Sequence, residues 1–123
     1  MELRDILKGA IEGTGEVAES LMSTAADIVK EGTHDIGDIF KEVINLGKEG
    51  AVDVAEGVKS VYIGAVNALK DSGKSTEEAV GEVTVKAERA IGEAAKEGEE
   101  EIGAAARKGI EEAKSVVKAP FEK

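Results

Sequence analysis

The only histidine of the chain stands three residues after a glutamate, in the stretch EGTH. Glu31 and His34 therefore have the spacing of the Glu-x-x-His pairs that hold di-iron centres in helical bundles. Such a centre needs further carboxylates that point inward from partner helices. Both residues fall on the polar side of the apolar pattern, and Gly32 lies between them. We expect a solvent-facing histidine near a helix boundary, and we keep Glu31 and His34 only as a weak metal candidate that subunits could share.

Other residue types that support catalysis lack partners in the sequence. The serines have no histidine at a spacing that indicates a nucleophile and its base. The stretch GTGE at 13–16 lacks the preceding strand and the lysine of a phosphate-binding loop. The absence of cysteine removes thiol nucleophiles, disulfides and zinc sites built from cysteine. We therefore predict no enzyme activity, no cofactor and no small-molecule substrate.

Composition and charge narrow the class of partner. The chain has 123 residues and a formal net charge of −10, which argues against nucleic acid because nucleic-acid-binding surfaces are basic. The same charge makes an anionic membrane surface possible but not favoured. The start MELRDILKGAIEG lacks the apolar core of a signal peptide, and no run reaches transmembrane length, so we expect a cytoplasmic protein. Abundant Glu and Lys without Gln is a composition shared with thermophilic proteins.

Apolar residues recur at steps of eleven along the whole chain. The columns that begin at Leu3, Ile6 and Leu7 stay mainly apolar to the last repeat. Eleven residues in three turns is about 3.67 residues per turn, so the apolar seam follows a nearly straight or right-handed path, whereas a heptad loses phase. The pattern predicts an all-α fold of long hendecad-repeat amphipathic helices with right-handed or nearly straight coiled-coil packing.

The large apolar residues in phase with this repeat form a predicted helix-packing stripe. The stripe consists of Leu3, Ile6, Leu7, Val17, Leu21, Ile28, Val29, Ile36, Ile39, Phe40, Val43, Val54, Val58, Val61, Tyr62, Leu69, Val80, Val83, Ile91, Ile102, Ile110 and Val117. Small residues on the flanks of the stripe are expected where helix backbones approach closely. They are Gly57, Ala68, Ala79, Gly81, Ala90, Gly92 and Gly103.

Breaks in the pattern divide the chain into helices near 2–31, 34–72 and 76–118, within a single domain over 1–123. A turn near 72–76 is expected because Gly73 can end a helix, and Ser75 with Glu78 has the spacing of a capping box. The similar lengths of the second and third helices favour an antiparallel hairpin or a three-helix arrangement. A continuous helix that pairs with other chains stays the alternative.

The start of the second helix has its own signals. Gly32 can end the first helix, and Thr33 or Asp35 can cap the next. The stretch GKEG at 47–50 is a weaker candidate for a turn. The expected boundaries therefore depend mainly on glycines and on polar residues that cap helices.

The eleven-residue repeat, together with the stretch KEG that recurs at Lys30, Lys48 and Lys96, resembles hendecad-repeat amphipathic proteins. Group 3 late-embryogenesis-abundant proteins, synucleins and exchangeable apolipoproteins share this style. The resemblance implies lipid-surface association or stress protection. Lysines crowd one flank here, and the stripe is rich in isoleucine and valine, which favours a folded state. We therefore predict a non-enzymatic structural protein that self-associates into a homo-oligomer or filament, with the lipid-surface or stress-protective role as the alternative.

Overall fold

The computed structural model describes residues 2–13, 16–95 and 99–118. This described part is all-α, as predicted, and contains no strand. Its six helices are α1 (Leu3–Glu12), α2 (Val17–Glu31), α3 (Ile36–Lys48), α4 (Val54–Asp71), α5 (Thr76–Ala94) and α6 (Glu100–Lys118).

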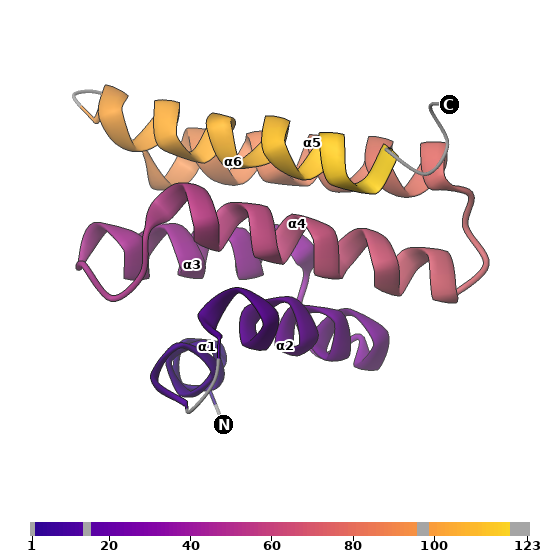
Figure 1. The fold of residues 1–123 in the computed structure, drawn as a ribbon, viewed down its shortest axis with the longest axis horizontal. Helices are drawn as coiled ribbons and strands as arrows, with labels where there is room; N and C mark the ends of the chain where they lie inside the picture. The colour runs from indigo at the N-terminus through magenta and orange to yellow at the C-terminus, as the bar shows by residue number, and fades with distance from the viewer. Residues whose placement is uncertain (1, 14–15, 96–98, 119–123) are drawn as a thin grey trace.

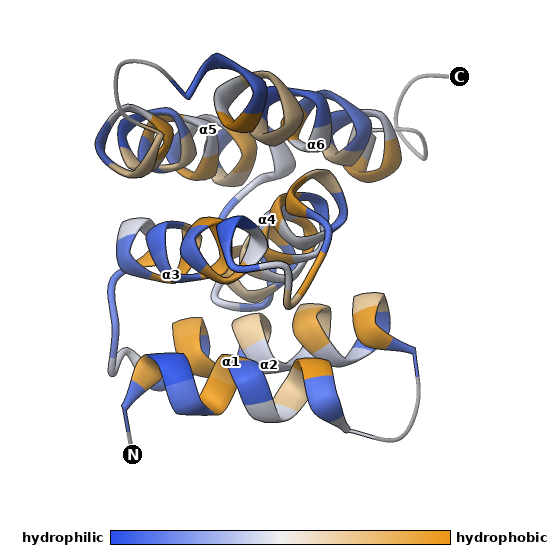
Figure 2. Ribbon diagram, turned by 90° about the vertical axis from the view of Figure 1, so that its left-hand side faces the viewer, coloured by the Kyte–Doolittle hydropathy of each residue, from blue (hydrophilic) through white to orange (hydrophobic). Residues whose placement is uncertain are grey.

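The helices form three layers, each made of two helices that follow one another in the chain. The α1–α2 layer lies at one end, α3–α4 in the middle and α5–α6 at the other end (Figure 1). The view turned by 90° shows the same order of layers (Figure 2). Helix α1 points along the line of sight in Figure 1, whereas α3 to α6 lie across the view, so α1 crosses the other layers. Stacked helix pairs of this kind build α-solenoids.

From α2 onward, helices two apart in the chain run parallel to each other. Met22 of α2 lies beside Gly64 of α4, and further along both helices Lys30 lies 3.0 Å from Asp71. Along α3 and α5, Lys86 reaches Asp35 at 2.7 Å and Lys41 reaches Glu93 at 3.0 Å. The contact therefore advances in the same direction on both helices. The same holds for α4 and α6, where the backbone of Ala55 lies beside Gly109 and Lys59 faces Glu112 at 3.9 Å. Parallel packing of alternate helices is what a stack of helical hairpins requires.

Three glycines in the left-handed conformation end three of the helices. Gly32, Gly50 and Gly73 have φ of 71°, 88° and 105°, a region that costs other residues energy. The C-terminal ends of α3 and α4 each have the 6→1 backbone hydrogen bond of a Schellman motif. The amide of Ala51 donates to the Leu46 carbonyl at 2.9 Å, and the amide of Lys74 donates to that of Leu69 at 3.1 Å.

Capping side chains start the following helices. Asp35 accepts from the amide of Gly37, and Asp53 accepts from that of Glu56. Before α5, Ser75 and Glu78 form the predicted capping box. The turn expected at 72–76 thus lies between α4 and α5.

Each of the three long helices expected from the sequence is in fact two helices. The segment 2–31 breaks after Glu12, where Gly13 is extended, and the segment 76–118 breaks at Ala95, whose φ and ψ are −100° and 83°. The segment 34–72 breaks after Lys48 because Gly50 turns left-handed and Asp53 caps a new helix. The prediction of three long helices was wrong because the apolar phase continues across each break, and phase alone does not reveal a hairpin. The weaker turn candidate at 47–50 does lie at the break between α3 and α4.

The middle helix α4 is buried on almost all sides, with Asn67 exposed between buried neighbours. It contacts α2, α3, α5 and α6. A helix enclosed in this way needs apolar or small residues around its whole circumference. Figure 2 shows α4 between the α1–α2 and α5–α6 layers, with orange stretches along it. The single-stripe prediction therefore missed core residues on the other sides of α3 and α4, namely Ile44, Leu46, Ile63, Ala65 and Val66.

All positions of the predicted stripe lie in the core or against it. Four of them are half-buried and pack on the core, whereas the others are buried; the four are Ile6, Val17, Val29 and Ile102. The chain thus buries its apolar stripe among its own helices. Packing of the stripe against another chain, on which the sequence-based prediction of self-association depended, is not needed to cover it.

Candidate functional site

A groove runs along α4 between α2 and α6 and has a volume of about 490 Å³. Helix α4 supplies its floor, and α2 and α6 supply its two walls. Its lining residues are Ala18 and Met22 from α2, Asp53, Ala55, Glu56, Lys59, Ser60 and Ile63 from α4 and its cap, and Lys108, Glu112 and Val116 from α6. We call this surface the α2–α4–α6 groove.

Two glycines bring the three helices of the groove together. A Cβ atom at Gly64 would overlap the carbonyl oxygen of Met22, and one at Gly109 would overlap that of Ala55. Each glycine therefore lets the next helix of the set approach backbone to backbone. The small side chains at Ala18 and Ala55 leave space between the helices that larger ones would fill, so the surface is hollowed there.

One end of the groove is apolar. Ala18, Met22 and Ile63 lie there together with Val116. The Val116 side chain is 47% exposed, and Val85 at 58% is the other large exposed apolar residue of the described chain. An exposed valine beside a half-buried methionine gives a partner apolar area to cover.

The other end of the groove is charged. Asp53 and Glu56 lie at the start of α4, and the Asp53 carboxylate accepts from the Glu56 amide at 3.0 Å. Lys59 and Glu112 face each other across the groove at 3.9 Å. Lys108 also lines the groove and has no ion-pair partner among the residues that the structure describes. The groove thus offers charges of both signs beside an apolar end.

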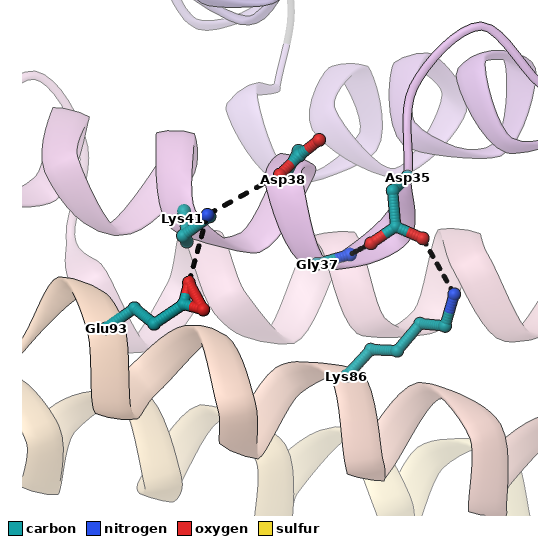
Figure 3. Close-up of polar contacts among 6 residues, drawn as sticks. All are labelled: Asp35, Gly37, Asp38, Lys41, Lys86 and Glu93. Atoms are coloured by element: carbon teal, nitrogen blue, oxygen red, sulfur yellow. Dashed lines mark hydrogen bonds and ion pairs between the residues drawn. The ribbon is translucent and has the colours of Figure 1, made fainter.

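A second polar site joins α3 to α5 around a hollow of about 120 Å³ (Figure 3). Asp35 accepts from the Gly37 amide at 2.9 Å and from the Lys86 ammonium at 2.7 Å. The hydrogen bond from Lys86, followed by that from Gly37, lowers the pKa of Asp35 below its usual value, against the effect of burial. This arrangement holds the start of α3 to the middle of α5.

Lys41 makes the second half of this site. Its ammonium lies 3.0 Å from Glu93 and 3.6 Å from Asp38, and Figure 3 shows it between the two carboxylates. The hydrogen bond to Glu93 raises the pKa of Lys41. The acids and bases drawn here satisfy one another, so the cluster acts as an ionic clamp between two helices.

The weak metal candidate from the sequence gains no further ligands. Glu31 is the exposed last residue of α2, and His34 lies in the following loop beside an open hollow that Glu2 and Arg4 also line. Within the described ranges, no three His, Cys, Asp or Glu side chains gather closely enough to hold a metal ion. Glu31 and His34 are therefore close in sequence but are not joined by a third possible metal ligand among the described residues.

The predicted small residues separate into two groups. Gly57, Ala68, Ala79, Ala90 and Gly103 are buried where helices pack. Gly81 and Gly92 are exposed, and a Cβ atom at either would meet nothing within 4 Å. No other helix of the described chain covers this face of α5, so close approach at Gly81 and Gly92 stays a prediction for contact with another chain.

Sequence reasoning missed Gly64 as a close-approach residue. Its signal was present, because Gly64 stands inside the run VYIGAV, which is apolar on both sides of the glycine. A glycine at the centre of a fully buried helix permits close approach of a neighbouring backbone.

No helix among the described residues is both long and apolar enough to cross a membrane. No protein-family model, no curated protein and no solved structure matches the chain.

Proposed function

We propose that the protein is a non-enzymatic structural protein that self-associates by helix packing into an oligomer or filament. The observation that carries this proposal is the α2–α4–α6 groove. Its apolar end, its mixed charges and its position between parallel helices suit an amphipathic helix, which lays apolar anchors into a groove of this type. Because the apolar stripe is covered within the chain, the proposal assigns association to the groove rather than to the stripe.

The dimensions of the groove also support this function. Its floor extends from Asp53 to Ile63, which corresponds to roughly 15 Å, or about three helical turns. A helix of three turns buries several side chains against such a floor. Docking would cover Val116, which the chain itself leaves half exposed.

Sedimentation velocity of the purified chain over roughly a hundredfold range of concentration tests the proposal, because association depends on mass action. We expect the average mass to rise with concentration. Val116→Asp, which puts a charge at the apolar end of the groove, should remain monomeric. A wild-type chain that stays monomeric throughout would overturn self-association.

The alternative drawn from the sequence is a lipid-surface or stress-protective role. It requires the helices to separate, because the apolar residues that would enter a lipid surface are buried in the described fold. The same preparation mixed with anionic vesicles distinguishes the two roles. Cosedimentation with vesicles together with monomeric behaviour in buffer would favour the lipid role and remove the proposal of self-association.

A further inference from the structure

We infer that the α2–α4–α6 groove binds a small amphipathic cation, an alkyl chain that ends in a primary ammonium group. The alkyl chain lies at the apolar end of the groove, and the ammonium group lies over Glu56 and Ser60. The inference goes beyond the proposed self-association and does not depend on it, because it concerns a ligand that enters the groove of a single chain.

The buried serine on the floor of the groove is the observation that points to a ligand. Ser60 is only 2% exposed, and apart from Tyr62, whose hydroxyl is hydrogen-bonded to α5, it is the one buried polar residue of the described chain. The hydroxyl of Ser72 donates to the Ala68 carbonyl of its own helix. The Ser60 side chain makes no hydrogen bond to any described residue. Because a buried hydroxyl without a hydrogen bond costs free energy, we expect a partner from outside the chain.

The Ser60 hydroxyl faces the groove. Among the described residues that are not exposed, every fully enclosed side-chain nitrogen or oxygen atom has a hydrogen-bond partner. The Ser60 oxygen has none, so it is not fully enclosed, and the open space that Ser60 lines is the groove. A slender molecule can reach an oxygen at this depth, whereas a docked helix is about 10 Å wide and lies over the groove. We therefore infer that a small molecule contacts Ser60.

The polarity of the groove changes in one direction along its length. On α4, Glu56, Ser60 and Ile63 follow one another at spacings of four and three residues, so they share one face of the helix and lie about one turn apart. They form a series from carboxylate to hydroxyl to apolar side chain. The parallel helix α6 has the same order, with Glu112 one turn before Val116. An alkyl chain with a polar head matches this order when its head lies at the carboxylates.

The charges of the groove determine the sign of that head group. Three carboxylates line the groove against two lysines, namely Asp53, Glu56 and Glu112 against Lys59 and Lys108. Glu56 has no ion-pair partner among the described residues, and Glu112 lies 3.9 Å from Lys59. The formal charge of −10 on the whole chain attracts a cation and repels an anion. A primary ammonium group has three donors, so it can bond to two carboxylates and a hydroxyl together.

The size of the groove suits a molecule of this kind. Its volume of about 490 Å³ lies within the range of about 300–1,000 Å³ that is usual for small-molecule sites. At its apolar end, Met22 is half-buried and Val116 is 47% exposed, so an alkyl chain can cover both. Each methylene group that leaves water in this way should tighten binding about fourfold.

Calorimetric titration with octylamine at neutral pH tests the inference on the full chain, at a protein concentration where sedimentation velocity shows a monomer. Octanoate has a similar alkyl chain and the opposite charge, whereas butylamine has the same charge and a shorter chain. We expect octylamine to bind at least about tenfold more tightly than either. Equal affinities for octylamine and octanoate would overturn the choice of a cation, and equal affinities for octylamine and butylamine would overturn the contact with the apolar end.

Two variants with matched controls locate the ligand. Glu56→Gln removes a carboxylate and Ser60→Ala removes the hydroxyl, and each should weaken octylamine binding about five- to tenfold. Glu101→Gln removes the same charge from the first turn of α6, and Ser23→Ala removes an exposed hydroxyl of α2. Neither control residue lines the groove, so both variants should bind octylamine like the wild type. Wild-type affinity in both Glu56→Gln and Ser60→Ala would show that octylamine does not bind at this site.

The stability of Ser60→Ala separates a ligand contact from a structural role. Since the hydroxyl has no partner in the described chain, urea denaturation without ligand should give an unfolding free energy that is unchanged or higher. A marked loss of stability would mean that the hydroxyl is bonded within the chain, and would remove it as a ligand contact.

The failure of this inference differs from the failure of the proposed function. A chain that self-associates but does not bind octylamine overturns the inference alone. A chain that binds octylamine in the groove but stays monomeric at every concentration overturns self-association and supports the ligand site.

Discussion

Gly64 of α4 lies against the carbonyl oxygen of Met22 in α2, so closely that a methyl group at position 64 would overlap this oxygen. The same relation recurs one layer further on, where Gly109 of α6 lies against the carbonyl of Ala55 in α4. In the contact of α4 with α2, the glycine belongs to α4. In the contact of α4 with α6, the glycine belongs to α6 and α4 supplies the backbone carbonyl. These two contacts set the spacing of the helices that form the groove.

Alanine at either position should destabilise the fold. The added carbon meets rigid backbone rather than the end of a flexible side chain, so a helix must shift. Overpacking of this kind costs about 1–3 kcal/mol, even though alanine favours the helix itself. Urea denaturation followed by circular dichroism measures the loss of unfolding free energy for Gly64→Ala and Gly109→Ala.

Gly9→Ala in α1 is the matched control, because a Cβ atom there meets nothing within 4 Å. It should leave stability unchanged or raise it by about 0.5–1 kcal/mol through helix propensity. Equal effects of Gly64→Ala and Gly9→Ala would contradict the backbone contact between α2 and α4.

The sequence indicated the class of the fold because the period of the apolar residues is helical throughout. It also located the end of α4 and the start of α5, since Gly73, Ser75 and Glu78 act locally and their roles follow from their own chemistry. The turn after α3 was only a weaker candidate at 47–50, and the breaks at Gly13 and Ala95 were missed, because the apolar phase resumes unchanged after each loop. A repeat that keeps its phase across a turn is equally compatible with a long helix and with a stack of short ones.

The groove could not be predicted from the sequence for a different reason. Its lining comes from three helices, and which faces of α2 and α6 meet α4 depends on contacts such as that between Gly64 and Met22. The polar residues of the groove belong to the outer faces in the sequence pattern. A local pattern does not say which outer faces lie next to each other.

Tyr62 links α4 to α5 through its hydroxyl group. This group lies 2.5 Å from the Thr84 hydroxyl and donates to the Val80 carbonyl at 3.2 Å, and the residue is buried. Tyr62→Phe should lower the unfolding free energy by about 0.5–1.5 kcal/mol, the usual net contribution of a hydrogen bond. Thr84→Val in the same background should have a smaller effect than in the wild type, because the partner is already lost. Additive effects of the two substitutions would show that the hydroxyls do not interact.

Alkaline pH tests the same residue by another route. Burial raises the pKa of the Tyr62 phenol above its ordinary value, with the Thr84 hydrogen bond acting in the opposite direction. Because the folded state holds the proton more tightly, stability should fall as pH rises above about 10, the value expected of an unfolded tyrosine. Tyr62 is the only tyrosine and the chain has no tryptophan, so absorbance at alkaline pH follows this phenol alone. Ionisation at the pH of free tyrosine in the folded chain would contradict its burial.

Asp35 carries two separable functions, the cap of α3 and the ion pair with Lys86. Asp35→Asn keeps an oxygen that can accept from the Gly37 amide and loses only the pair. It should cost at most about 1 kcal/mol, because both side chains of the pair are partly exposed to water. Asp35→Ala removes both and should cost about 1–2 kcal/mol, as expected from the loss of a helix cap.

The lowered pKa of Asp35 makes the contribution of the ion pair depend on pH. The pair stabilises the fold fully above the ordinary aspartate pKa near 4. This stabilisation disappears as pH falls through the pKa that Asp35 has in the folded chain. Thermal melts of both variants and of the wild type across this pH range measure this effect. At low pH the melting temperature of Asp35→Asn should approach that of the wild type, whereas that of Asp35→Ala should stay lower because the cap is lost. A difference between Asp35→Asn and the wild type that does not change with pH would mean that Lys86 contributes nothing through charge.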